Sequence, residues 1–99
     1  MIRHTVVFRL THPAGSAEES KFLADALCLV AIPGVARFER LRQTSPKNPY
    51  RFGFSMEFAD ATAYRTYNDH PVHRRFVAER WLPEVAEFME IDYEPLPGA

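Results

Sequence analysis

Apolar and polar residues alternate along several segments of this chain. Residues 2–10 and 50–58 carry their larger apolar side chains at every second position, which is the pattern of a half-buried β-strand. Residues 35–43 alternate with more charge, as is typical of a strand at the edge of a sheet. A short run at residues 91–94 is predicted to form a last strand. His4 lies on the more apolar side of the first strand.

A first helix is predicted to follow the first strand. Ser16 and Glu19 have the spacing of a capping box, and Pro33 with Gly34 ends the helix. Its apolar residues recur every three or four positions, at Phe22, Leu23, Ala26, Leu27 and Val30. The single cysteine, Cys28, has apolar neighbours and is predicted to be a buried thiol.

The second half of the chain is predicted to hold two further helices. Asp60 is the expected N-cap of a short helix that ends at His70, because Pro71 disfavours helical geometry in the residue before it. The next helix keeps one apolar side as far as Phe88, with a break expected near Leu82 because proline follows. The order strand, helix, strand, strand, helices, strand is that of ferredoxin-like α+β folds, in which helices cover one face of an antiparallel sheet.

The other face of this predicted sheet has no helix to cover it. On the first and third strands it would carry Arg3, Thr5, Val7, Arg9, Arg51, Gly53, Ser55 and Glu57. This surface is too mixed for a dry core, and a second copy of the chain would cover both it and the sheet edges. We therefore expect a homodimer.

Size and charge narrow the class of protein. Ninety-nine residues make one domain, 1–99, and 12 basic against 13 acidic residues give a net charge of −1. A near-neutral chain lacks the basic surface of a nucleic-acid-binding protein. Because there is no signal-peptide pattern, no apolar run long enough to cross a bilayer and one lone cysteine, we expect a cytoplasmic protein with no membrane association.

Residues with proton-transfer chemistry gather around the break at Pro71. Tyr67 and His73 flank it, and with His4 they form a candidate acid–base site, because imidazole and phenol groups donate and accept protons. The simpler interpretation of each is structural: His70 would cap the chain reversal, and the others would form internal hydrogen bonds. No metal is expected, because no cysteine or acidic pair completes a tetrahedral set with the histidines.

Five short motifs occur in order along the chain. They are Ile2-Arg3-His4-Thr5-Val6-Val7-Phe8, Ile32-Pro33-Gly34-Val35, Phe58-x-Asp60, Tyr64-x-x-Tyr67-x-x-His70-Pro71-x-His73-x-x-Phe76-Val77 and Asp92-Tyr93. As a set they resemble the stress-responsive dimeric α+β barrel (A/B barrel, Dabb) family over nearly the full length. The resemblance implies a dimer whose two sheets close into a barrel.

The resemblance implies less about activity, because most of the family has no assigned reaction. Related barrels include monooxygenases, haem-degrading enzymes and decarboxylases. One branch, similar to plant polyketide cyclases, performs an aldol condensation without a cofactor, and its working residues correspond to His4, Tyr67 and His73. The cleft of such a site would be bounded by Phe22, Phe54, Met56 and Trp81, with His70 nearby.

Two functions from different classes stay open at this point. The first is a small-molecule-binding or stress-associated domain without strong catalytic activity, in which the cleft is filled or binds a hydrophobic or aromatic metabolite. The second is a cofactor-independent cyclase or lyase in which His73 is the base and Tyr67 or His4 donates to the developing oxyanion. A monooxygenase is a third option, by analogy of fold alone. The open volume of the cleft separates the first two, since a ligand pocket needs roughly 300 Å³ or more.

Overall fold

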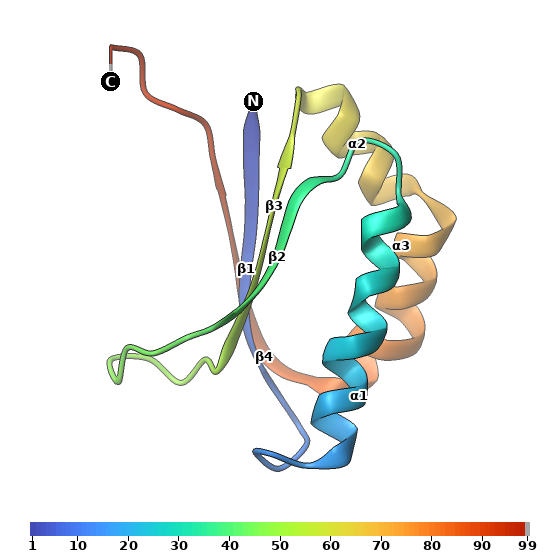
Figure 1. Ribbon diagram of the computed structural model, residues 1–99, viewed down its shortest axis with the longest axis vertical. Helices are drawn as coiled ribbons and strands as arrows, with labels where there is room; N and C mark the ends of the chain where they lie inside the picture. Colours follow the sequence, from blue (N-terminus) through green and yellow to red (C-terminus); the bar gives the residue numbers. More distant parts are fainter. Residues whose placement is uncertain (99) are drawn as a thin grey trace.

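A four-stranded antiparallel sheet carries every helix on one of its faces (Figure 1). The computed structural model describes residues 1–98. Its strands are β1 (Ile2–Leu10), β2 (Ala36–Arg42), β3 (Phe52–Phe58) and β4 (Val85–Tyr93), arranged in the order β2-β3-β1-β4. The predicted ferredoxin-like α+β fold is therefore confirmed, with β2 at one edge as expected.

The first helical segment is capped as predicted but winds differently toward its end. The Ser16 hydroxyl accepts the Glu19 N–H at 3.2 Å, and the Glu19 carboxylate accepts the Gly15 N–H at 3.0 Å. After α1 (Ala17–Asp25) the chain tightens into the 3₁₀ helix η1 (Ala26–Ala31). Three residues per turn direct Ala26 and Leu29 into the core.

Three predictions of burial in this helical segment are wrong. Leu27 is 45% exposed, Val30 is 49% exposed, and Cys28 is exposed as well. The buried residues of this segment are instead Phe22, Ala26 and Leu29, which themselves recur at helical spacing.

The second helical region is divided where the sequence predicted. Asp60 caps α2 (Ala61–Asp69) by accepting the Ala63 N–H at 2.8 Å. His70 has extended backbone geometry, and its Nδ1 accepts the Val72 N–H at 3.1 Å at the start of α3 (Pro71–Phe76). The predicted capping role of His70 is therefore confirmed.

The end of this region departs from the prediction. The π-helix η2 (Val77–Trp81) and the single turn α4 (Leu82–Glu84) follow α3, and β4 begins directly afterwards. The expected helix up to Phe88 is wrong, whereas the expected last strand is present but begins at Val85 instead of Ile91. Phe88 lies opposite Phe8 in the β1–β4 ladder, so long-range pairing overrides the local helical spacing once Pro83 has interrupted the helix.

The core lies between the sheet and the helices and is built mainly from aromatic side chains. Phe8, with no exposed surface, is at its centre, and its ring centroid lies 4.7–6.0 Å from those of four other aromatic residues. Those four are Phe22, Phe52, Phe54 and Trp81. Such ring pairs add to the stabilisation that comes from burial of apolar surface.

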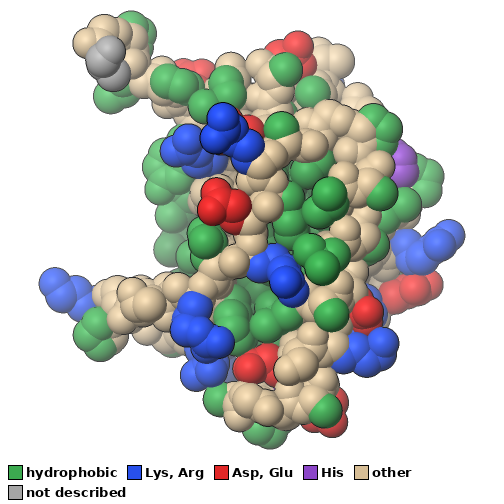
Figure 2. All heavy atoms as spheres, in the orientation of Figure 1, with side chains coloured by type: hydrophobic (Ala, Val, Ile, Leu, Met, Phe, Trp, Pro, Cys, Tyr) green, Lys and Arg blue, Asp and Glu red, His purple; other side chains and the backbone are tan. Residues whose placement is uncertain are grey.

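The opposite face of the sheet has no covering layer (Figure 1). Strand register places Leu41, Gly53, Val7 and Met89 in one row across it, with Leu41 and Met89 each 46% exposed. Toward one end, Arg3 lies between Glu57 and Tyr93. The side of the molecule shown in Figure 2 carries basic, acidic and apolar side chains interspersed with one another. None of the described helices is long and apolar enough to span a membrane.

Candidate functional site

His4 occupies one end of the covered face and is oriented by two other side chains. Its Nδ1 lies 2.6 Å from Asp92 Oδ1 and 2.8 Å from the Tyr64 hydroxyl oxygen, and that hydroxyl donates to Asp92 Oδ2 at 2.9 Å. A carboxylate only accepts, so Nδ1 carries the hydrogen and Nε2 of the neutral ring keeps its lone pair. Asp92 and Tyr64 thereby select the tautomer of His4.

Tyr67 lies between His4 and His73. Its ring centroid is 4.4 Å from that of His73 and 6.2 Å from that of His4. His73 Nδ1 donates to the Asn68 carbonyl at 3.1 Å, which leaves Nε2 as the acceptor of the neutral ring. Burial lowers the pKa of His73, so the neutral form dominates at pH 7.

The Tyr67 hydroxyl is the polar group of this cluster that most clearly lacks a partner. The residue is 2% exposed, and within residues 1–98 its hydroxyl forms no hydrogen bond. Within the same residues, no fully buried side-chain oxygen lacks a hydrogen-bond partner. Because the Tyr67 hydroxyl has no partner, it must face open space, which is a cavity. Burial raises the pKa of Tyr67, which keeps the hydroxyl protonated and able to donate.

A cavity of about 40 Å³ lies beside this hydroxyl, between the sheet and the helices. Its polar lining is His4, Tyr67, His73 and Glu90. The rest of the lining is mainly apolar and consists of Val6, Leu29, Phe54, Met56, Phe76, Val77 and Trp81, of which Trp81 also carries an indole N–H. Val77 and Trp81 are the first and last residues of the π-helix, an element that is often found at functional sites.

The structure brings together most of the predicted site residues. His4, Tyr67, His73, Phe54, Met56 and Trp81 all line this cavity. Phe22 lies deeper in the core, with its ring centroid 6.2 Å from that of Trp81, and His70 is engaged in capping α3. Neither Phe22 nor His70 lines the cavity.

Sequence reasoning missed the roles of Tyr64, Asp92 and Glu90. Asp92 is the register partner of His4, and Glu90 is that of Val6, in the pairing between β1 and β4. Both acidic residues fall on the covered face because side chains two apart along a strand share a face. The motifs did contain Tyr64 and Asp92-Tyr93, and this was the signal available in the sequence. The strand register that places Asp92 beside His4 could not be read from it.

Aromatic side chains keep the cavity small. About 40 Å³ holds one or two water molecules or the end of a ligand, far below the roughly 300 Å³ of a fully formed ligand pocket. Phe54 and Trp81, whose ring centroids are 6.4 Å apart, both line the cavity. A ligand larger than the cavity would have to extend past its rim.

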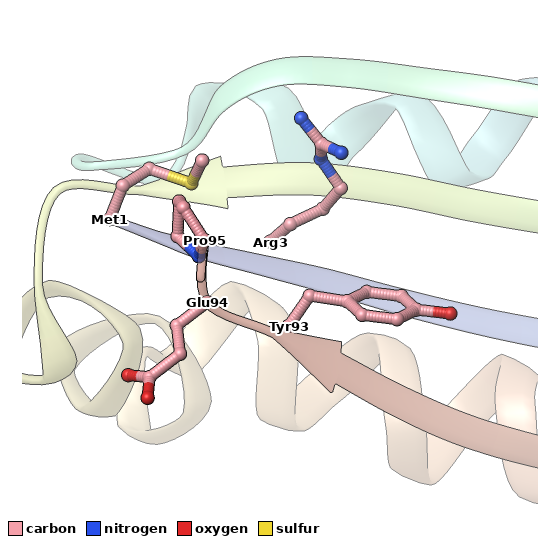
Figure 3. Close-up of a pocket in the computed structure, with 5 residues that line it drawn as sticks. All are labelled: Met1, Arg3, Tyr93, Glu94 and Pro95. Carbon is pink, nitrogen blue, oxygen red and sulfur yellow. The ribbon is translucent and has the colours of Figure 1, made fainter. Parts of the chain in front are cut away.

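A larger hollow of about 360 Å³ lies elsewhere, at the end of β1 and β4 (Figure 3). It is lined by Met1, Arg3, Tyr93, Glu94 and Pro95. In Figure 3 the Glu94 carboxylate points away from Arg3, and no histidine takes part. Within residues 1–98 no cluster of three or more His, Cys, Asp or Glu residues is arranged to hold a metal ion. The cavity beside Tyr67 is therefore the better candidate for chemistry.

Comparison with known families identifies this combination of fold and motifs. The model of the stress responsive A/B barrel domain, Dabb, matches residues 2–95. The chain belongs to this family, which confirms the resemblance of its motifs. No curated protein matches the chain.

Solved structures agree with this assignment. A Dabb family protein with a ferredoxin-like fold from Mesorhizobium loti is 64% identical, with a TM-score of 0.95 and 96% of each chain covered. A dimeric ferredoxin-like protein of unknown function from Thermobifida fusca is 22% identical, with a TM-score of 0.78. The match covers 95% of this chain and 90% of that protein's chain. A hydroxynitrile lyase from Passiflora edulis is 15% identical, with a TM-score of 0.81, and the match covers 97% of this chain and 96% of the lyase chain. The last two show the shared fold alone.

Proposed function

We propose that this protein is a homodimer that binds a small, mainly apolar molecule in the cavity between its sheet and its helices. The observation that carries the proposal is the Tyr67 hydroxyl, which belongs to a side chain only 2% exposed and lacks a partner within residues 1–98. Because the hydroxyl opens on the cavity, a ligand or an ordered water there can supply the hydrogen-bond partner that the described residues do not. We place the protein in the cytoplasm, in keeping with a free and exposed cysteine.

Ligand binding is tested by NMR titration with a set of small apolar compounds. We expect the signals of Tyr67 and His73 to shift. Val77→Phe should abolish the shifts, because Val77 lines the cavity and a larger side chain fills it. Val72→Phe is the matched control, since Val72 is half-buried against the same core without lining the cavity. If the cavity signals stay unchanged with every compound, the binding function is rejected.

The uncovered sheet face supports the homodimer. Four apolar side chains on it, Leu41, Met89, Ile91 and Tyr93, are 37–52% exposed, and charged residues such as Arg3 and Glu57 lie around them. An apolar centre with a polar rim is the composition of a protein interface, and a related dimeric protein shares this fold. The hollow at Arg3 and Tyr93 lies on this face as well.

Sedimentation equilibrium tests the dimer. Val7→Glu places a charge at the centre of the face and should shift the protein to monomers. Val30→Glu makes the same substitution on the exposed side of η1 and should leave a dimer. A wild-type chain that sediments as a monomer would reject the proposal.

Proton-transfer catalysis is the second candidate, favoured by the 4.4 Å separation of the Tyr67 and His73 rings. Neutral His73 could remove a proton α to a carbonyl through Nε2, and the protonated Tyr67 hydroxyl could donate to the oxygen on which charge develops. This chemistry suits an aldol-type cyclase or a lyase. Turnover of polyketide-like substrates that is lost in His73→Ala, with the fold retained, would establish it. No turnover in the wild type would leave the binding function.

A further inference from the structure

The cavity beside Tyr67 is lined by an unpaired carboxylate and by no cation. Glu90 lines it from β4, yet within residues 1–98 it forms no hydrogen bond or ion pair. Neither lysine nor arginine is among the described lining residues. The electrostatic potential in the cavity therefore depends on the charge of Glu90 and on the protonation states of His4 and His73.

The histidines do not offset the charge of Glu90. His4 and Asp92 together carry a net charge of zero when the ring is protonated and of −1 when it is neutral, because Asp92 Oδ1 lies 2.6 Å from Nδ1. His73 is half-buried among apolar residues, and this burial lowers its pKa although the hydrogen bond to the Asn68 carbonyl acts in the opposite direction, so the ring is neutral at pH 7. The site is net negative in either state of His4.

The hydrogen-bonding groups of the cavity also have a preferred partner. His73 Nε2 and the Glu90 carboxylate can only accept, and so does His4 Nε2 while that ring is neutral. The Tyr67 hydroxyl can donate, and the indole of Trp81 is the other N–H or O–H donor among the lining side chains. A ligand that supplies a hydrogen satisfies this set better than one that only accepts.

The rim of the cavity is aromatic. Glu90 is exposed and still lines the cavity, so the opening lies at β4. Phe88 stands two residues from Glu90 on the same face of the strand, is 48% exposed, and packs edge-on against Trp81 at 5.5 Å between centroids. An apolar ring that is too large for about 40 Å³ would rest on these two residues.

We propose that the cavity takes the hydroxyl end of a small uncharged molecule with an aromatic body, and that it discriminates against carboxylates. The hydroxyl group donates to His73 or Glu90 and accepts from Tyr67. A carboxylate of the same size would face Glu90 with no cation to offset the repulsion, and an ammonium group would lose more hydration on entering so small a cavity than its few acceptors replace. This inference rests on the proposed small-molecule function of the same cavity.

Four matched probes test the inference: benzyl alcohol, benzyl methyl ether, benzoate and benzylamine, each titrated into the intact protein at neutral pH and followed by NMR. We expect the alcohol to shift the signals of Tyr67, His73 and Glu90. The ether, which has no hydrogen to donate, and benzoate should each bind about tenfold more weakly, because the acceptors of the site stay unpaired or repel the charge.

The variant Glu90→Gln separates charge from shape. It should bring the affinity for benzoate to within about threefold of that for the alcohol, because like-charge repulsion is removed while the side-chain volume is kept. Glu87→Gln is the matched control: it lies on the same strand but on the uncovered face, opposite Arg9, and should leave the preference unchanged.

Each outcome bears on one of the two proposals. If benzoate or the ether binds as well as the alcohol, the present inference is overturned while small-molecule binding stands. If benzylamine binds more tightly than the alcohol, the ligand is a cation and the requirement for an uncharged molecule is wrong. If no probe moves the cavity signals, the binding function fails and the inference fails with it.

Discussion

Aromatic rings lie at both ends of the covered sheet face, but the packing of these rings differs between the two ends. At one end Phe8 and Phe22 pack ring against ring, with centroids 5.9 Å apart, and neither lines the cavity. At the other end His4, Tyr64 and Tyr67 are equally close, with centroids 5.0–6.5 Å apart, but each carries a polar atom that needs a partner.

The difference shows what opens a cavity in so small a core. His4 and Phe8 occupy the same face of β1, separated only by Val6 on that face. Apolar rings interdigitate at any contact angle that fills space, whereas hydrogen bonds hold His4 and Tyr64 in the orientation that Asp92 requires. Packing is less complete there, and the free hydroxyl of Tyr67 faces the space that results.

The largest expected effect comes from breaking the packed end. Phe8→Ala should lower the free energy of unfolding by roughly 3–5 kcal/mol, because a fully buried ring is replaced by a cavity. Phe88→Ala is the matched control on the neighbouring strand; that ring is 48% exposed, so the loss should be about 1 kcal/mol. Urea unfolding measures both. Similar losses for the two variants would contradict the assignment of the packed end as the main source of stability.

A smaller effect is expected at the border of the packed end, where Arg80 lies over the Phe22 ring and pairs with Asp25 and Glu84. Arg80 lowers the pKa of Glu84, so this stabilisation is present above pH 4.5 and is lost as the pH falls and the carboxylate is protonated. Arg80→Met should cost about 1 kcal/mol at pH 7 and less at pH 3.5.

The control for Arg80 is Lys21→Met, which removes a 72% exposed side chain that also pairs with Asp25. Its effect on unfolding should be close to zero at both pH values. A loss in Arg80→Met that is the same at pH 7 and pH 3.5 would mean that the contact with the Phe22 ring, rather than the ion pairs, is responsible.

At the polar end, Tyr64→Phe should cost about 1 kcal/mol, because it removes one hydroxyl from the bonds to Asp92 and His4 and keeps the ring stacked on Phe58. Tyr50→Phe controls for loss of a hydroxyl from a half-buried tyrosine outside this network. The His4 ring resonances should move in the first variant and not in the second. Unchanged resonances in Tyr64→Phe would show that Asp92 alone orients His4.

The smallest effect concerns the dependence of stability on pH. Burial lowers the pKa of His73 below the 6.5 of the unfolded chain, so between these two values the unfolded state binds more protons. The contribution of His73 is therefore present above pH 6.5 and is lost as the pH falls toward its lower folded value. His73→Gln should lose less stability than the wild type between pH 7.5 and 5, by less than about 1 kcal/mol. If the free energy of unfolding changed equally with pH in the wild type and in His73→Gln, His73 would be solvated in the folded protein.

Local chemistry in the sequence determined much of this molecule. The alternation in β1 and β3 defined which side of each strand is buried, the side chains of Ser16 and Asp60 began their helices, and the His70-Pro71 pair divided α2 from α3. Each depends on residues within a few positions of one another, so spacing alone is informative. The motif around Tyr67 and His73 likewise indicated the right end of the fold.

The tertiary structure decided what depends on distant partners. The pairing of β1 with β4 extended β4 back to Val85 and set Asp92 beside His4, 88 positions away in the chain. The packing of the helices on the sheet leaves Cys28 exposed, and the cavity between these two layers measures about 40 Å³. Strand register and side-chain packing minimise the free energy of the whole core, and no local pattern specifies them.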